Sequence, residues 1–102
     1  MINELKELFE TELSKMKAWN KVSGMRVWRS EQYSATIHVV ICINSDKYEE
    51  EIIDEIYDIY FNIRDKCKEF LEEDDIISLH ILPELKLSRE VTNTELEAIF
   101  NE

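Results

Sequence analysis

The chain has little of the two residues that interrupt regular structure, with one glycine and one proline among 102 residues. That scarcity leaves no room for long linkers, so we expect most of the chain to lie in helices and strands. Charged residues make up 34% and hydrophobic residues 44%, which is typical of a folded chain rather than a disordered one. This length predicts a single domain over residues 1–102.

Positive charge is also scarce. Twelve lysines and arginines stand against 23 aspartates and glutamates, so the formal net charge is −11. A surface of this sign lacks the cationic groups that neutralise phosphates, which argues against nucleic-acid binding and against anionic membranes. It favours cations or a basic protein as partners.

Long apolar runs are absent, and no stretch approaches the roughly 20 residues of a membrane span. The segment Met1-Ile2-Asn3-Glu4 has neither the basic region nor the apolar core of a signal peptide. The two cysteines, Cys42 and Cys67, show no paired spacing. We therefore predict reduced thiols, no membrane insertion and a cytoplasmic location.

Apolar residues recurring at steps of three and four predict two main helices, over residues 2 to about 18 and about 46 to 72. Asp46 with Glu49 fits a capping box at the start of the second helix. Thr92 with Glu95 predicts a short last helix that continues through Phe100.

Alternating polarity predicts three strands, at residues 25–30, 34–43 and 76–82. The second strand has one wholly apolar face, which should pack on helices and consists of Ala35, Ile37, Val39, Ile41 and Ile43. The chain's two histidines, His38 and His80, have the opposite parity in their strands. Both imidazoles should therefore lie on the sheet face away from the helices.

The order of these elements is helix, strand, strand, long helix, strand and short helix. The first two strands predict a hairpin, and the long helix predicts a right-handed parallel crossover to the third strand. The expected fold is an α+β open-faced sandwich with a three-stranded mixed sheet. Its core covers residues 2–83, and residues 84–102 form a C-terminal extension.

The second sheet face is too apolar for free exposure and too polar for a core. Tryptophan and arginine are enriched in protein interfaces, and uncovered apolar patches mark contact sites. We therefore predict a homodimer through this face, with the interface residues Arg26, Trp28, Val40 and Leu82.

Three segments carry a resemblance to a known family. Residues 22–28 read Val-Ser-Gly-Met-Arg-Val-Trp, residues 35–40 read Ala-Thr-Ile-His-Val-Val, and residues 78–83 read Ser-Leu-His-Ile-Leu-Pro. In this order, with the predicted helices between them, they resemble the cytoplasmic C-terminal domain of the cation diffusion facilitator (cation efflux) transporters. The resemblance runs from about Leu5 to Pro83.

The resemblance implies a ferredoxin-like fold that dimerises in a V shape and binds divalent cations near the dimer interface, regulating an attached transmembrane part. His38 and His80 match histidine positions of that family, and Glu51 lies where some members place another ligand. Ser23 or Gly24 stands at an early histidine position, and Leu82 replaces the aspartate of a His-x-Asp-Pro motif. The transmembrane part is absent from this sequence, so the chain is not itself expected to transport.

The candidate metal site consists of His38, His80, Glu51 and Cys42, because zinc takes about four ligands from histidine, cysteine and carboxylate side chains. The resulting hypothesis is a soluble, dimeric domain that binds or senses a divalent transition metal, with zinc as the first candidate. Alternatively, the two histidines hydrogen-bond or sense pH.

A hypothesis from another class is an acidic protein-interaction module of the inhibitor or immunity type, with a basic protein partner and no metal. No nucleophile elbow, phosphate loop or His-Glu-x-x-His helix is visible. We therefore do not expect an enzyme.

Overall fold

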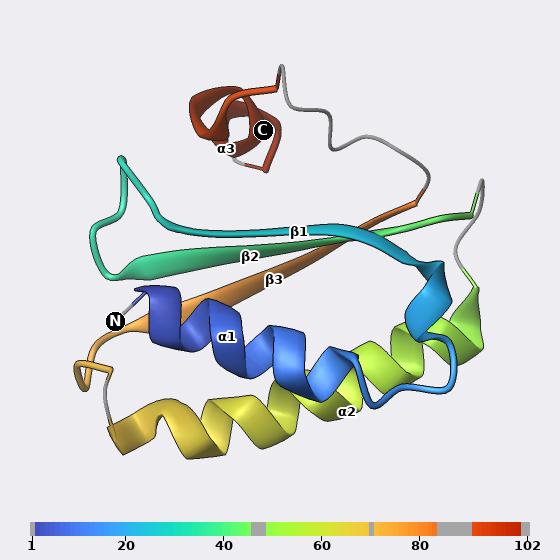
Figure 1. The fold of residues 1–102 in the computed structure, drawn as a ribbon. Helices are drawn as coiled ribbons and strands as arrows, with labels where there is room; N and C mark the ends of the chain where they lie inside the picture. Colours follow the sequence, from blue (N-terminus) through green and yellow to red (C-terminus); the bar gives the residue numbers. More distant parts are fainter. Residues whose placement is uncertain (1, 46–48, 70, 84–90, 101–102) are drawn as a thin grey trace.

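Two helices and a three-stranded sheet form the main layers of the computed structural model, which describes residues 2–45, 49–69, 71–83 and 91–100 (Figure 1). The α+β class, the element order and the mixed sheet are as predicted, consistent with a ferredoxin-like arrangement. The elements in chain order are α1 (Ile2–Leu13), the 3-10 turn η1 (Trp19–Lys21), β1 (Val22–Arg29), β2 (Thr36–Ile43), α2 (Glu50–Lys66), the 3-10 turn η2 (Cys67–Glu69), β3 (Ile76–Pro83) and α3 (Asn93–Phe100).

The sheet has the order β1-β2-β3, with β1 antiparallel to β2 and β2 parallel to β3. This pairing confirms the predicted hairpin followed by a helical crossover. His38 in β2 lies opposite Trp28 in β1 and Ser78 in β3. The next residue of the same parity, Val40, lies opposite His80. The register therefore places Trp28, His38, Val40, Ser78 and His80 on the same face of the sheet.

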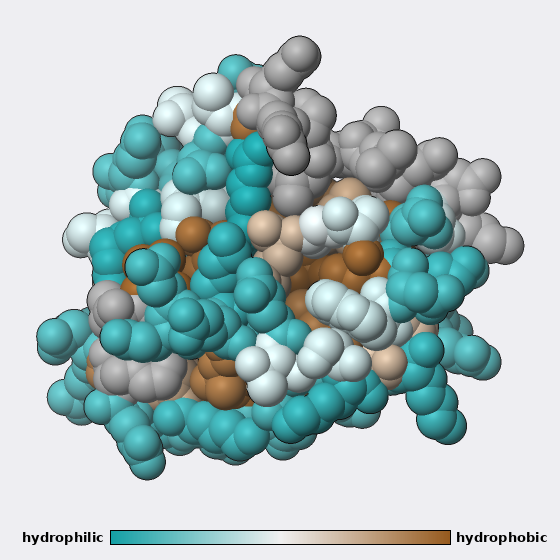
Figure 2. Space-filling view, viewed as in Figure 1, coloured by the Kyte–Doolittle hydropathy of each residue, from teal (hydrophilic) through white to brown (hydrophobic). Residues whose placement is uncertain are grey.

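The other face carries the hydrophobic core, because α1 and α2 both pack against it (Figure 1). β2 runs through the middle of the sheet, and its apolar alternation buries every second side chain against these helices. The core residues with no solvent exposure are Leu5, Phe9, Ile37, Val39, Ile41, Ile43, Ile56 and Ile63. On the side of the molecule drawn in Figure 2, polar side chains cover most of the surface.

Both main helices are shorter than predicted. α1 ends at Leu13, where the Ser14 hydroxyl donates to the carbonyl of Thr11 and competes with continued helical bonding. α2 covers residues 50–66 rather than about 46–72, and Asp46 of the predicted capping box lies outside the described residues. Two basic residues in its last turn suit the negative end of the helix dipole, whereas the acidic residues at 72–75 would oppose a longer helix.

The second sheet face is not open, because α3 packs on it. Trp28, Val40 and Leu96 form a second buried cluster, with Leu82 partly buried beside it. The guanidinium of Arg26 donates to the carbonyl of Val91 and to Asn93 Oδ1, which fixes the start of the helix. The four residues predicted to form a dimer interface therefore lie under or beside α3. The exposure from which the homodimer was predicted is largely lost.

The start of α3 follows the prediction, since the amide of Glu95 donates to the Thr92 hydroxyl at 3.1 Å. In the part of the chain that the structure describes, no helix combines the length and the apolar character needed to cross a membrane.

Substituting Ile56 by alanine tests the core between α2 and the sheet. Ile56 has no exposed surface, so the lost contacts and the cavity should lower the free energy of unfolding by about 2–5 kcal/mol. The matched control is Ile99→Ala, since Ile99 is 61% exposed and its truncation should change stability by no more than about 0.5 kcal/mol. Urea denaturation followed by circular dichroism measures both, and equal losses would contradict this core assignment.

Candidate functional site

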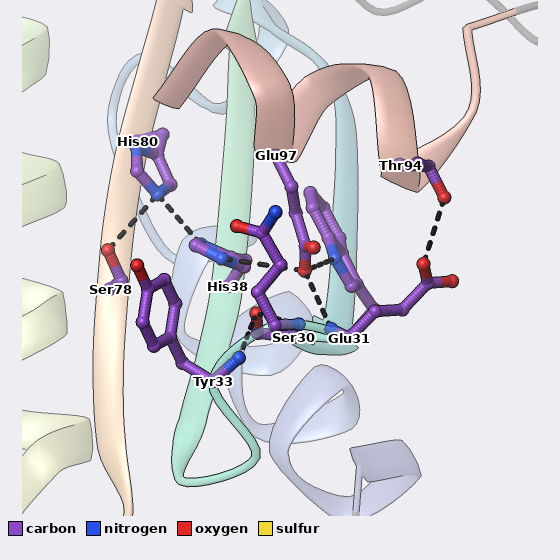
Figure 3. A network of polar contacts seen from close by, with 10 residues as sticks. Ser30, Glu31, Tyr33, His38, Ser78, His80, Thr94 and Glu97 are labelled. Carbon is purple, nitrogen blue, oxygen red and sulfur yellow. Dashed lines mark hydrogen bonds and ion pairs between the residues drawn. The ribbon is translucent and has the colours of Figure 1, made fainter. Parts of the chain in front are cut away.

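The two histidines meet beneath α3. His38 Nδ1 lies 3.0 Å from His80 Nε2, within hydrogen-bond distance (Figure 3). His38 comes from the central strand and is 3% exposed, and His80 comes from the edge strand β3. The structure thus brings together the two residues whose matching parity placed them on one face. Only one proton can lie between these two nitrogens, so one ring donates this hydrogen bond and the other accepts it.

A buried carboxylate lies on the other side of His38. Glu97, in α3, is only 3% exposed. Its Oε1 accepts hydrogen bonds from Trp28 Nε1 at 2.9 Å and from the Glu31 amide at 3.2 Å. Burial raises its pKa, but the bonds from Trp28 and Ser30 and from the Glu31 amide outweigh burial, so the pKa of Glu97 is lowered. Glu97 is therefore held ionised inside the protein.

The carboxylate of Glu97 also orients His38. Its Oε1 is 3.6 Å from His38 Nε2, and this nitrogen has no hydrogen-bond partner among the described residues. A nearby negative oxygen favours the tautomer with the proton on Nε2, which leaves the lone pair on Nδ1 directed at His80. Burial lowers the pKa of His38 although Glu97 opposes this effect, so the ring is neutral at pH 7.

His80 is held from two further directions. Its Nε2 lies 3.1 Å from the Ser78 hydroxyl, and the ring of Phe100 in α3 stacks on the imidazole with centroids 3.6 Å apart and planes 5° apart. Burial, together with the neighbouring His38, lowers the pKa of His80 to about 4. Both imidazoles are therefore neutral at pH 7, and each offers a lone pair to a hydrogen bond or to a metal ion.

The other two predicted ligands do not join this pair. Cys42 lies on the same face of β2, four residues or about 13 Å along the strand from His38, and opposite Leu82, which is two residues beyond His80 in β3. Glu51 is exposed in the first turn of α2, on the opposite side of the sheet. Across the described residues, no group of three or more His, Cys, Asp or Glu side chains is arranged to hold a metal ion.

Sequence reasoning missed the part of the site that α3 supplies. Leu96 and Phe100 mark the inward stripe of this helix, and Glu97 follows Asn93 by four residues on the same side. The apolar residues Leu96, Ile99 and Phe100 predict a stripe that leaves Glu97 to one side, and Ile99 is in fact 61% exposed, so no pattern in the sequence marks Glu97 as buried. The sequence does not show which sheet face the helix covers.

Models of known protein families, curated proteins and solved structures were each compared with this chain, and none of them matches it. The resemblance to the cation diffusion facilitator domain therefore stays a prediction.

The lowered pKa of His80 predicts how stability changes with pH. The folded-state value of about 4 lies below the ordinary value of 6.5, so the unfolded chain binds more protons between these limits. Stability should therefore be full above pH 6.5 and fall as the pH drops toward 4, by on the order of 1–2 kcal/mol after allowing for residual solvent exposure. Urea denaturation across this range, with His80→Gln as the non-titrating variant, measures the difference.

The same pKa can be observed directly by NMR, because His38 and His80 are the only histidines. Two imidazole signals should be seen, one with a midpoint near pH 4 and the other below its ordinary value. Two midpoints near 6.5 would contradict the buried arrangement.

Replacing Glu97 by alanine tests what holds α3 in place. The substitution leaves the Trp28 indole N–H and the Glu31 amide without their acceptor, so the free energy of unfolding should fall by about 1–3 kcal/mol. The emission of Trp28 should also shift to longer wavelength. Glu10→Ala, the same substitution on the exposed side of α1, is the control and should have little effect. Equal stability of the two variants would show that the carboxylate does not anchor the helix.

Proposed function

We propose that His38 and His80 bind a divalent transition metal ion, and that the chain is a non-catalytic metal-binding or metal-sensing domain. The observation that supports this proposal is the 3.0 Å separation of His38 Nδ1 and His80 Nε2. Two nitrogens bound to one tetrahedral zinc ion, at about 2.0–2.1 Å each, are separated by about 3.3 Å. Binding of a shared ion would move the proton between these nitrogens to His80 Nδ1, and both rings would turn their lone pairs toward the ion.

The surroundings of His38 also suit a ligand. Metal-binding histidines usually direct their second ring nitrogen to a carboxylate or carbonyl, which fixes the tautomer and makes the ligating nitrogen more basic. Glu97 Oε1 lies on that side of His38, 3.6 Å from Nε2. Since both rings are neutral at pH 7, no proton has to be removed from an imidazolium before binding.

Two histidines are fewer ligands than a structural zinc site contains, since such sites hold four. Among the described residues, Cys42 and Glu51 do not form a metal-binding group with the pair, so the remaining positions require water or donors from another molecule. We therefore expect modest affinity for a single chain. If a second copy supplied donors, metal binding would have to offset the repulsion between two chains of charge −11 each, and it would then promote the predicted homodimer by mass action, which suits a sensor.

The alternative class, an acidic interaction module, does not compete for these residues. The net charge of −11 is a property of the whole surface, whereas the histidine pair lies beneath α3. A protein-binding role would use an exposed surface and leave the pair to hold α3 in place. The two hypotheses can therefore be tested separately.

Calorimetric titration with zinc at pH 7.5 tests the proposal on wild-type protein, His38→Ala, His80→Ala and the double variant. If the two side chains share one ion, each single variant should lose as much affinity as the double variant, by at least about tenfold. Affinity should also fall as the pH drops toward the lowered pKa values of the pair, about 4 for His80, since an imidazole must be neutral to ligate.

Two further variants serve as controls. Cys42→Ser and Glu51→Gln should keep the wild-type zinc affinity, because neither side chain forms a metal-binding group with the pair among the described residues. Circular dichroism of each variant verifies that the fold is retained. Equal zinc affinity in the wild type and all three histidine variants would remove this site from consideration.

A further inference from the structure

Within the described residues, the outer edge of β3 presents backbone groups that no other strand pairs. β3 pairs only with β2, and no strand lies on its other side within the described residues. The amide of Ile76 donates inward to Ala35, and the Tyr60 hydroxyl donates to the carbonyl of Ile77. Since backbone groups alternate in direction along a strand, those of Leu79 and Ile81 point outward like those of Ile77. These two residues offer N–H and C=O groups to another strand.

The two edges of the sheet differ in their protection against such pairing. Proteins shield edge strands with charged side chains and β-bulges, because an unprotected edge pairs with other chains. β1 has both devices: Arg26 and Arg29 within the strand, and a bulge between Val22 and Gly24. β3 is regularly paired over Ile76–Pro83 and contains no Lys, Arg, Asp or Glu. Of the devices that shield strand edges, β3 has only a proline, Pro83, at its last position, so residues 76–82 of this edge are without them.

Exposed aromatic rings lie beside this unprotected edge. Tyr60, bonded to Ile77, contacts the rings of Tyr57 and Phe61 at centroid distances of 6.4 and 5.3 Å. Tyr57 is 41% and Phe61 47% exposed, although both are large and apolar. Where α2 meets the start of β3, an open groove of about 680 Å³ continues this surface, with Tyr60 and Ile77 in its wall. Aromatic groups of this kind form the energetic centres of protein interfaces.

Two partners could bind this surface, a second copy of the chain or a segment of another protein, and the net charge of the chain favours one of them. A second copy would bring another −11 to the interface, and the two copies would repel each other. A basic segment would be attracted by the same field and by Glu72 and Glu73 in the groove wall, and it would meet the positive charge of Arg64 over the rings of Tyr60 and Phe61. An extended segment with alternating residues suits a strand edge, because backbone bonds supply affinity and alternate side chains contact the neighbouring surface.

From these observations we infer that the outer edge of β3 and the aromatic residues Tyr57, Tyr60 and Phe61 of α2 bind an extended basic segment of another protein by strand addition. The bond from Tyr60 to Ile77 limits the new pairing to Leu79 and Ile81. The surface lies apart from the histidine pair, so this inference stands independently of metal binding.

The probe is a short, end-blocked peptide of alternating lysine and valine, added to the full chain. NMR should show slower hydrogen exchange at the amides of Leu79 and Ile81. Phe61→Ala should weaken binding by at least about tenfold, as loss of an aromatic interface residue does. Ile99→Ala, which truncates a residue exposed on α3, should leave the affinity unchanged.

Two matched peptides test the chemistry of the occupant. Replacing every lysine by glutamate should abolish binding, and replacing alternate valines by proline should do the same because proline cannot donate a ladder hydrogen bond. Equal binding of the acidic peptide, protection at β1 instead of β3, or no binding of the basic peptide would overturn the inference. Sedimentation showing self-association that Phe61→Ala abolishes would instead identify a second copy as the occupant.

Discussion

The position of α3 on the sheet depends on one interaction. The buried carboxylate of Glu97 accepts hydrogen bonds from groups on the sheet side. Glu97 brings a negative charge into a nearly dry interior, which is costly unless the charge is hydrogen-bonded. The indole of Trp28 and the amide of Glu31 meet that requirement, and both belong to β1 or the turn that follows it. A short helix with little apolar surface is thereby held in one orientation on the sheet.

The position of this helix determines the chemistry of the histidines. Phe100 lies flat on His80, and Glu97 faces the far nitrogen of His38, so α3 both desolvates the pair and selects a tautomer. Without the helix, the rings would lie on an open sheet face and titrate in the ordinary range for histidine. The site therefore belongs to two parts of the chain: two strands that provide the nitrogens, and a C-terminal helix that sets their protonation.

The elements that the sequence predicted well are those with a strong internal period. One parity of β2 is wholly apolar, so its face toward the helices and the side on which His38 lies followed from the sequence, and His80 followed by the same rule in β3. The docking of α3 was not predictable in this way, because its short apolar stripe is compatible with either face of the sheet.

Helix ends were also misplaced: the apolar period continues beyond Lys66 and Leu13, and local hydrogen bonds and charges end the helices earlier. Cys42 and Glu51 were predicted as ligands from their residue type and from the family resemblance. Neither argument says how far these residues lie from the histidines in the folded chain.

The unequal size of the two apolar clusters has a consequence for how the molecule opens. The cluster under α1 and α2 extends over the whole sheet, whereas the cluster under α3 is built around Trp28, Val40 and Leu96. Segments with few buried contacts open at a lower free energy than the rest of a protein, as separate cooperative units. We therefore expect α3 to detach while the sheet and its two main helices stay folded. The chain then has a partly open state in which the imidazoles meet water, recover their ordinary basicity and no longer contact Glu97 or Phe100.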